Sequence, residues 1–299
     1  TKTFGPVVAN DDISLSVKQG EILALLGENG SGKTTLMNML SGIYHPDSGT
    51  IYVRGERRTI ASPHDALSLG IGMIHQHFKL VDVFTAQDNI VMGTEKDRRL
   101  RKKALAGEIT SLCQKYGLEI DPLKKTYNMS VSEKQTVEIL KVLYRGADIL
   151  ILDEPTAGLD PKERIRIRNL ISDLSQDRIV LIATHVVSDI EFISKEILLM
   201  KNGRLIDKAS PEQLQAKIQG KVFEMSVGQQ ELEEVKEKFE ISNLFRKDGQ
   251  IIVRVVTQKR PEGYDEIREA APTLEDVYLY EFEVKGAMPV SYTHLRAHE

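Results

Sequence analysis

A glycine-rich loop with a lysine and a threonine is the part of this sequence best suited to chemistry. Residues 27–34 read Gly-Glu-Asn-Gly-Ser-Gly-Lys-Thr, which fits the pattern G-x-x-x-x-G-K-[ST]. Because glycine has no Cβ, successive backbone N–H groups of such a loop can turn inward around phosphate oxygens. Lys33 would add a positive charge at the β and γ phosphates, and the Thr34 hydroxyl would be a ligand for Mg²⁺. The spacing predicts a nucleotide phosphate site.

Two acidic residues follow a second apolar run. Asp153 and Glu154 come directly after residues 149–152 (Ile-Leu-Ile-Leu), which have the composition of a buried strand. In open α/β sheets, ligands bind at the edge where parallel strands end. Asp153 is therefore predicted to hold Mg²⁺ through water, and Glu154 to polarise the water that attacks the γ-phosphate. Alone, such a pair is usually solvated charge at a strand end. Because the sequence also contains the phosphate-binding pattern of residues 27–34, the catalytic interpretation is favoured.

Two further polar residues are expected at the same edge. His185 ends the next predicted strand, from which an imidazole can reach the γ-phosphate. Gln76 lies in the stretch Met-Ile-His-Gln-His, where its amide oxygen can join the metal shell or orient water. The flanking His75 and His77 suggest a metal pair, but the sequence offers no further ligands at suitable spacing, so the structural interpretation is favoured.

The elements that must position these residues alternate between strand and helix. Residues 13–17 alternate in polarity like a strand, and residues 21–26 form an apolar run that leads straight into the loop. Beyond the loop, Leu36, Met39 and Leu40 recur at helical spacing. Residues 179–183 form another apolar run, and a helix is expected after Pro161. This order predicts a mostly parallel sheet covered by helices on both faces.

Composition limits the alternatives. The chain has 299 residues and a net charge of -4, which gives no overall attraction to nucleic acid. The single Cys113 excludes an internal disulfide and fits a reducing compartment. The longest apolar runs of the chain have the length of a strand, well short of a bilayer span. We therefore expect no nucleic acid partner and no membrane-spanning segment.

The chain divides into a main domain and a smaller part. We expect a domain over residues 1–210, with a helical subdomain at about 80–146, and a small α+β appendage over 211–285. The chain begins with Thr1, without Met, so we expect a missing upstream segment. Residues 286–299 form a tail, of which 290–299 (VSYTHLRAHE) resemble the translation of a sequencing adapter.

Taken together, these motifs resemble the ATP-binding cassette (ABC) transporter ATPases, up to about residue 285. Residues 27–34 look like Walker A, 149–154 like Walker B, Gln76 like the Q-loop, 158–160 like the D-loop and His185 like the switch histidine. The resemblance implies a P-loop NTPase fold with an added antiparallel β subdomain. It also implies a role for Phe4 in stacking on adenine and assigns the nucleotide contacts to Gly27, Asn29, Gly30, Ser31, Gly32, Lys33, Thr34 and Thr35.

The resemblance further implies that two cassettes enclose two ATP molecules, with each loop facing the other subunit's signature segment. Here that segment is residues 129–133, Met-Ser-Val-Ser-Glu, where the family pattern is L-S-G-G-Q. Ser130, Ser132 and Glu133 are thus expected to contact nucleotide. Ser132 replaces a glycine that lets the backbone approach the γ-phosphate, and Thr136 stands where an arginine is usual. Hydrolysis by a pair of identical chains is therefore less strongly predicted than binding.

The two halves resemble different subfamilies. Residues 71–93 resemble the cassettes of nucleoside and simple-sugar importers, whereas the part from Gly158 onward resembles drug-exporter or ABC-2 cassettes. A chimeric chain is therefore one hypothesis. The leading functional prediction is a peripheral ATPase subunit with ATP and Mg²⁺ as cofactors, on the cytoplasmic face of a bacterial-type plasma membrane. Its expected partners are a second cassette and transmembrane permease subunits. The alternatives are a nucleotide-gated module that hydrolyses poorly and a soluble ABC protein that does not transport.

Overall fold

The computed structural model describes residues 1–94, 102–247 and 249–285. The predicted tail, with its adapter-like sequence, lies outside these residues. The chain divides into a first unit, Thr1–Ala209, and a second unit that begins at Ser210. Among the described helices, none combines the length and apolar character needed to cross a bilayer.

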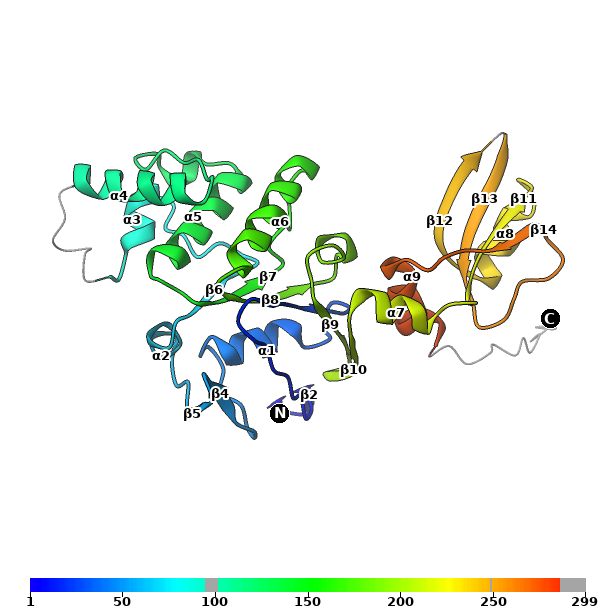
Figure 1. Cartoon of the computed structure of the whole chain (residues 1–299), viewed down its shortest axis with the longest axis horizontal. Helices are drawn as coiled ribbons and strands as arrows, with labels where there is room; N and C mark the ends of the chain where they lie inside the picture. Colours follow the sequence, from blue (N-terminus) through cyan, green and yellow to red (C-terminus); the bar gives the residue numbers. More distant parts are fainter. Residues whose placement is uncertain (95–101, 248, 286–299) are drawn as a thin grey trace, which may run out of the picture. The chain divides into compact units, whose positions relative to one another are not determined.

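The first unit is built around one twisted sheet (Figure 1). Its strands follow the order β10-β9-β3-β8-β7-β6, in which the pairs from β9 to β6 are parallel and β10 is antiparallel to β9. These strands are β3 (Ile22–Leu26), β6 (Ile71–Ile74), β7 (Ile149–Asp153), β8 (Ile179–Thr184), β9 (Glu196–Lys201) and β10 (Arg204–Ala209). Two small antiparallel pairs accompany the sheet: β1 (Lys2–Phe4) with β2 (Val7–Asn10), and β4 (Ile51–Val53) with β5 (Glu56–Arg58).

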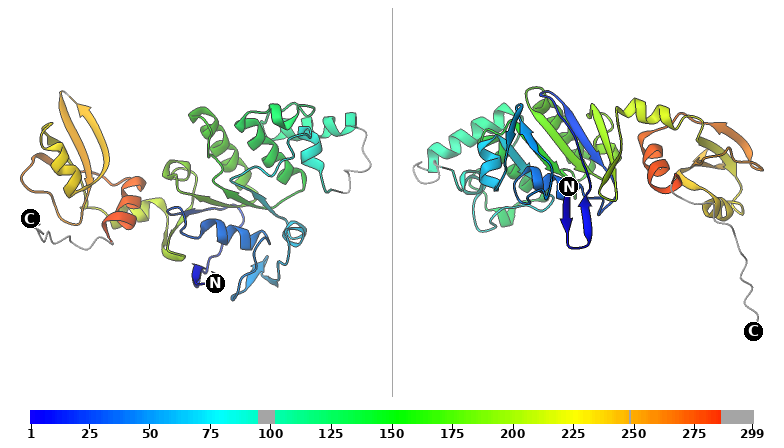
Figure 2. Two further views of the ribbon diagram at one scale, coloured as in Figure 1. Left: turned by 180° about the vertical axis from the view of Figure 1, so that it is seen from behind. Right: turned by 90° about the horizontal axis from the view of Figure 1, so that it is seen from below.

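Helices cover both faces of this sheet. Helix α1 lies on one face and α5 and α6 on the other, as Figures 1 and 2 show from opposite sides. The helices of the unit are α1 (Lys33–Leu40), α2 (Pro63–Ser68), α3 (Ala86–Val91), α4 (Lys102–Lys115), α5 (Val131–Tyr144) and α6 (Pro161–Ser175), with short 3-10 turns at Thr126–Asn128 and Val187–Asp189.

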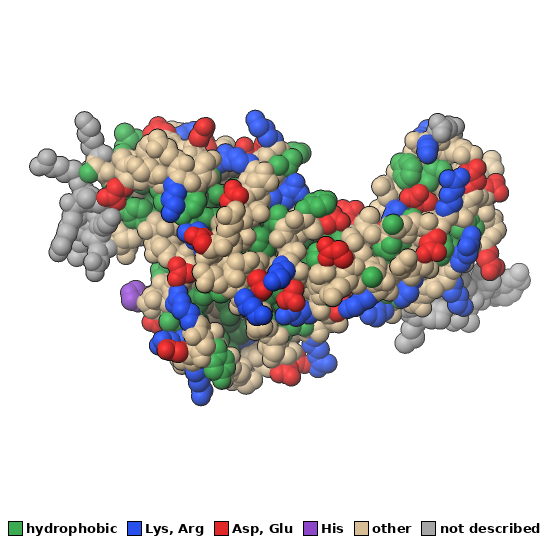
Figure 3. All heavy atoms as spheres, viewed as in Figure 1, with side chains coloured by type: hydrophobic (Ala, Val, Ile, Leu, Met, Phe, Trp, Pro, Cys, Tyr) green, Lys and Arg blue, Asp and Glu red, His purple; other side chains and the backbone are tan. Residues whose placement is uncertain are grey.

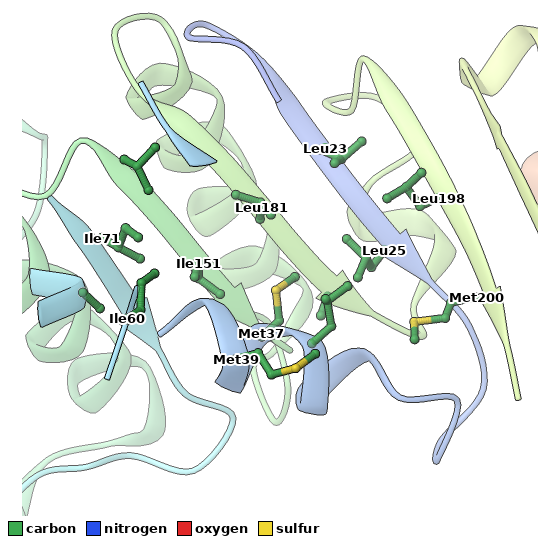
Figure 4. Close-up of a cluster of buried hydrophobic side chains, with 14 residues drawn as sticks. Leu23, Leu25, Met37, Met39, Ile60, Ile71, Ile151, Leu181, Leu198 and Met200 are labelled. Atoms are coloured by element: carbon green, nitrogen blue, oxygen red, sulfur yellow. The ribbon is translucent and has the colours of Figure 1, made fainter. Parts of the chain in front are cut away.

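The hydrophobic core packs around β3, the strand that leads into the glycine-rich loop. All five residues of β3 are buried, as expected for an inner parallel strand. Leu23 and Leu25 of this strand pack with Met37 of α1 and Leu181 of β8 (Figure 4). A fully buried side chain of this kind contributes about 1.5–3 kcal/mol. The strand end that leads into the loop is thereby fixed.

One strand prediction is wrong. Residues 13–17 form no strand, although their side chains alternate between half-buried and exposed. Ile13, Leu15 and Val17 pack against the sheet core through their side chains, without a partner strand for their backbone. The alternation in the sequence thus reports burial on one side and not a hydrogen-bonded ladder.

The second unit contains a separate antiparallel sheet with the strand order β12-β13-β11-β14. Its elements are α7 (Pro211–Lys217), β11 (Val222–Val227), α8 (Leu232–Lys238), β12 (Glu240–Lys247), β13 (Gln250–Val256), β14 (Asp265–Glu269), α9 (Leu274–Leu279) and a π-helical turn at Tyr280–Val284. Apolar residues of β11, β13 and α8 form its core.

The other face of β13 in this unit carries a buried ion pair. Arg254 donates to Asp276 of α9 at 2.7 Å and to Glu224 of β11 at 2.9 Å. The Asp276 side chain is fully buried. Burial by itself would raise the pKa of Asp276, but the bonds from Arg254 and Thr273 lower it below its ordinary value. The pair therefore ties α9 to the sheet.

Candidate functional site

The loop of residues 27–34 connects β3 to α1, and backbone contacts hold it closely. Gly32 has φ +101°, and a Cβ there would lie 2.2 Å from the Ala9 carbonyl oxygen. A Cβ on Gly27 would lie 2.2 Å from the Met200 carbonyl oxygen. Both positions require glycine because backbone, which cannot move aside, fills the space.

Neighbouring elements fix the loop from outside. Asn10, at the end of β2, donates to the Gly32 carbonyl at 3.1 Å, and the backbone N–H of Gly203 donates to the Ser31 carbonyl at 3.0 Å. The Ser31 hydroxyl is buried and has no hydrogen-bond partner within the described residues. A buried polar atom usually has a partner, so this unsatisfied oxygen indicates a ligand in the loop.

Lys33 points back into the loop. Its Nζ donates to the carbonyl oxygens of Gly27 at 2.8 Å and Glu28 at 2.9 Å. Burial lowers its pKa, an effect that the nearby carboxylates of Glu154 and Asp153 oppose. The ammonium group is thus held by the backbone of the loop. Of the other loop residues, Asn29 and Gly30 are exposed, and Thr35 after the loop is half-buried. An anion with several oxygen atoms would complement this charge.

Two of the three predicted Mg²⁺ ligands, Thr34 and Asp153, contact each other. Thr34, on the first turn of α1, donates through its hydroxyl to Asp153 Oδ1 at 3.3 Å, although 119 residues separate them in the chain. Asp153 is buried at the end of β7. Burial raises its pKa above the ordinary value, and the neighbouring Glu154 adds to the increase.

Glu154 sits directly after β7 with a positive φ of 49°. Its Oε1 accepts from the backbone N–H of His185 at 3.1 Å and lies 2.8 Å from His185 Nδ1. Its Oε2 accepts from the Thr184 hydroxyl at 3.0 Å. The carboxylate is therefore buried and oriented from β8, while the His185 side chain is 46% exposed.

Gln76 occupies the next strand end. It follows β6 by two residues and is exposed. Because β6, β7, β8 and β3 are adjacent and parallel, the strand ends at Ile74, Asp153, Thr184 and Leu26 meet at one edge of the sheet. His75 and His77 flank Gln76, and within the described residues no cluster of three or more His, Cys, Asp or Glu side chains suits a metal ion.

Phe4 lies on β1, which pairs with β2 and not with the parallel sheet. Its ring packs edge-on against Tyr44 with the centroids 5.2 Å apart, and 42% of the residue is exposed. Asp47 fixes the strand by accepting from Lys2 at 2.8 Å and from the Thr3 backbone at 2.6 Å. These bonds hold the pKa of Asp47 well below its usual range. A flat aromatic surface is thus kept available.

The signature segment caps helix α5. The Ser130 hydroxyl accepts from the Glu133 N–H at 3.2 Å, and the Glu133 carboxylate accepts from the Ser130 N–H at 2.8 Å and from Lys124 at 2.6 Å. Burial raises the pKa of Glu133, but these bonds lower it overall. Ser132 bonds through its hydroxyl to Glu163 of α6. The bonds of these side chains therefore run within the segment, to Lys124 and to α6.

Sequence reasoning missed several residues that shape the site. Thr184 donates to Glu154, and Asn10 donates to the loop. Glu163 binds Ser132 of the signature segment, and Arg166 binds Thr136 just after it. Position next to His185 was the only sequence signal for Thr184. The others are far away in the chain and belong to no motif that we identified.

Comparison with known proteins identifies the family. Residues 10–157 match the family model described as ABC transporter. The chain is 46% identical over 210 residues to the nucleoside import ATP-binding protein NupA of Lactococcus lactis subsp. cremoris, covering 69% of this chain and 42% of that protein. It is 52% identical over 178 residues to the guanosine import ATP-binding protein NupO of Bacillus subtilis, covering 59% of this chain and 35% of that protein. The chain thus spans less than half the length of either relative.

A solved structure agrees with the sequence comparisons. The cbiO1 protein of Clostridium perfringens, part of the ABC transporter complex cbiONQ, superposes with a TM-score of 0.61 at 29% identity, over 70% of this chain and 84% of that protein. The fold class predicted from the sequence is confirmed. Residues 10–157 of the chain thus form an ABC transporter domain.

Proposed function

We propose that this chain is the ATP-binding and ATP-hydrolysing subunit of an ABC transporter. The observation that carries the proposal is the single sheet edge at which the phosphate-binding loop, Asp153 and Glu154 lie together. In this proposal the chain works with a second cassette and separate permease subunits at the cytoplasmic face of the membrane. The names of the two bacterial relatives support a nucleoside import system as the setting.

The site fits Mg²⁺ as well as ATP. The Thr34 hydroxyl and the Asp153 carboxylate are hard oxygen ligands already in contact, and Gln76 lies at the adjacent strand end. When bound, Mg²⁺ would neutralise part of the charge on the phosphate oxygens. Lys33 and the N-terminal end of α1 would bind the remaining charge.

In the proposed mechanism, Glu154 accepts the proton of the attacking water. His185 and Thr184 orient its carboxylate through three contacts of 2.8 to 3.1 Å. These contacts fix the direction in which the carboxylate points, as a base that must reach a water molecule requires. We propose that His185, half exposed beside Glu154, contacts the γ-phosphate.

The segment after Gln76 is suited to pass movement to a permease. Lys79 donates through its backbone to the buried Glu138 of α5 at 2.5 Å, and its carbonyl accepts from Lys141 at 2.9 Å. Asn89 of α3 binds both backbone groups of Val81. Val83 is 65% exposed within this braced segment. We propose residues 80–89 as the surface through which the γ-phosphate site acts on membrane partners.

Phosphate release from Mg-ATP by the purified chain, beside the Glu154→Gln variant, tests this proposal. Hydrolysis by the parent that is largely lost in the variant supports the enzyme. Equal rates would favour the second candidate, a nucleotide-gated module that binds ATP and hydrolyses it poorly, for which Ser132 in a glycine position is the motive.

A third candidate, a soluble ABC protein acting on nucleic acid, has less support. The net charge is -4, and Figure 3 shows Lys and Arg intermixed with Asp and Glu over the face it presents. A nucleic-acid site normally gathers basic residues on one face. Recovery of the tagged chain with membrane proteins, free of RNA, is the expected result.

A further inference from the structure

A ring of four side chains joins the first two turns of α5 to the first two turns of α6. The Ser132 hydroxyl donates to the Glu163 carboxylate, which also pairs with Arg166 at 3.3 Å. Arg166 donates to the Thr136 hydroxyl at 3.0 Å, and that hydroxyl donates to the Ser132 carbonyl at 3.0 Å. The ring therefore holds Ser132 by its side chain and by its backbone.

The ring lies at a surface and not in the core. Glu163 and Arg166 keep 20% and 36% of their side chains exposed. With Ser130, Ser132, Glu133 and Asp160, they line a cleft of about 830 Å³. Water could satisfy the Ser132 hydroxyl here. Burial therefore does not require its bond to a carboxylate.

We propose that Glu163 is a positioning residue for the signature segment. By binding the Ser132 hydroxyl, it holds that group against α6, so that the hydroxyl is not free to turn toward the nucleotide of a partner cassette. The inference rests on the proposed function, since only a paired cassette presents such a nucleotide. It explains how a side chain can stand at Ser132, where the family pattern has glycine.

Arg166 belongs to the same arrangement. The family pattern has an arginine at the position of Thr136, and here the guanidinium of Arg166 reaches that threonine from α6. Glu163 fixes this guanidinium as well as the serine. Glu163 thus reaches both positions that depart from the pattern, Ser132 directly and Thr136 through Arg166.

Hydrogen exchange of the amides in residues 129–136 tests the positioning role. We expect Glu163→Ala to speed exchange about tenfold, as the loss of a charge-assisted bond would. Glu163→Gln should stay within about twofold of the parent, because its amide oxygen still accepts from Ser132. Ser132→Ala should resemble Glu163→Ala, which provides a second route if the latter folds poorly. Equal effects of Glu163→Ala and Glu163→Gln would overturn the proposal.

A second readout separates this proposal from the proposed function. In a Glu154→Gln background with Mg-ATP, Glu163→Ala should weaken self-association about tenfold but leave ATP affinity unchanged, because Glu163 lies on α6 and outside the phosphate-binding loop. In a Ser132→Gly background, the same change should have less than about a twofold effect. Additive effects of Glu163→Ala and Ser132→Gly on self-association would refute the positioning role. Failure of the parent to bind ATP would instead refute the proposed function, and the hydrogen exchange result would still hold.

Discussion

Replacement of Glu154 by glutamine removes a negative charge while preserving most of the local geometry. The glutamine oxygen can still accept from the His185 backbone, and its NH₂ group can donate to the Thr184 hydroxyl oxygen, which now acts as acceptor. The variant should therefore fold like the parent. What it loses is the basic carboxylate beside the phosphate-binding loop.

The expected loss in hydrolysis follows from that basicity. A positioned general base contributes about 100- to 10,000-fold, which corresponds to about 2.7–5.4 kcal/mol in the activation free energy. We expect turnover at saturating Mg-ATP to fall by this factor while ATP affinity changes little, because the phosphate-binding groups of Ser31, Lys33 and Thr34 remain.

Phosphate release and ATP binding should be measured on the same preparations. The exposed Glu56 on β5 provides a matched control, and Glu56→Gln should have no effect on either quantity. If Glu154→Gln hydrolyses ATP within about threefold of the parent, Glu154 is not the base and the proposed mechanism is wrong.

Two further predictions concern buried carboxylates. Asp153→Asn should raise the free energy of unfolding at pH 7 without nucleotide, because burial raises the folded-state pKa of Asp153 and the ionised form is disfavoured. The protonated Asp153 stabilises the fold fully below its unfolded-state pKa, and this contribution is lost as pH rises through the folded-state pKa. The gain in unfolding free energy of Asp153→Asn over the parent should therefore vanish in urea titrations at low pH. Lower stability of the variant than of the parent at pH 7 would contradict this. Arg254→Met should destabilise the second unit by about 3–5 kcal/mol, since it leaves the buried Asp276 without its cation. Denaturation followed by amide exchange on β13 measures this, with the exposed Arg268→Met as a control; equal stability of the two variants would refute the role of the pair.

The sequence predicted the site best where local pattern and chemistry coincide. The strand before the loop and the helix beginning at Lys33 follow from apolar runs and spacing within a few residues. Residues 13–17 show the limit of this reasoning, because a side chain pattern of period two does not reveal whether the backbone finds a partner strand.

Contacts between distant segments were beyond prediction. The bond of Ser132 to Glu163 spans 31 residues, and that of Asn10 to Gly32 spans 22. Such pairs depend on how α5 packs on α6 and how the β1–β2 hairpin meets the loop. The suggested resemblance of residues from 158 onward to exporter cassettes stays a prediction.

Calorimetric titration of Mg-ATP into the purified chain and its Lys33→Met variant tests the central claim most directly. Lys195→Met, which removes an exposed lysine of the same unit, is the control. We predict saturable binding by the parent and by the control, and about 10- to 100-fold weaker binding by Lys33→Met, from the loss of a charge-assisted bond to phosphate. Equal affinities for the parent and Lys33→Met would contradict the account.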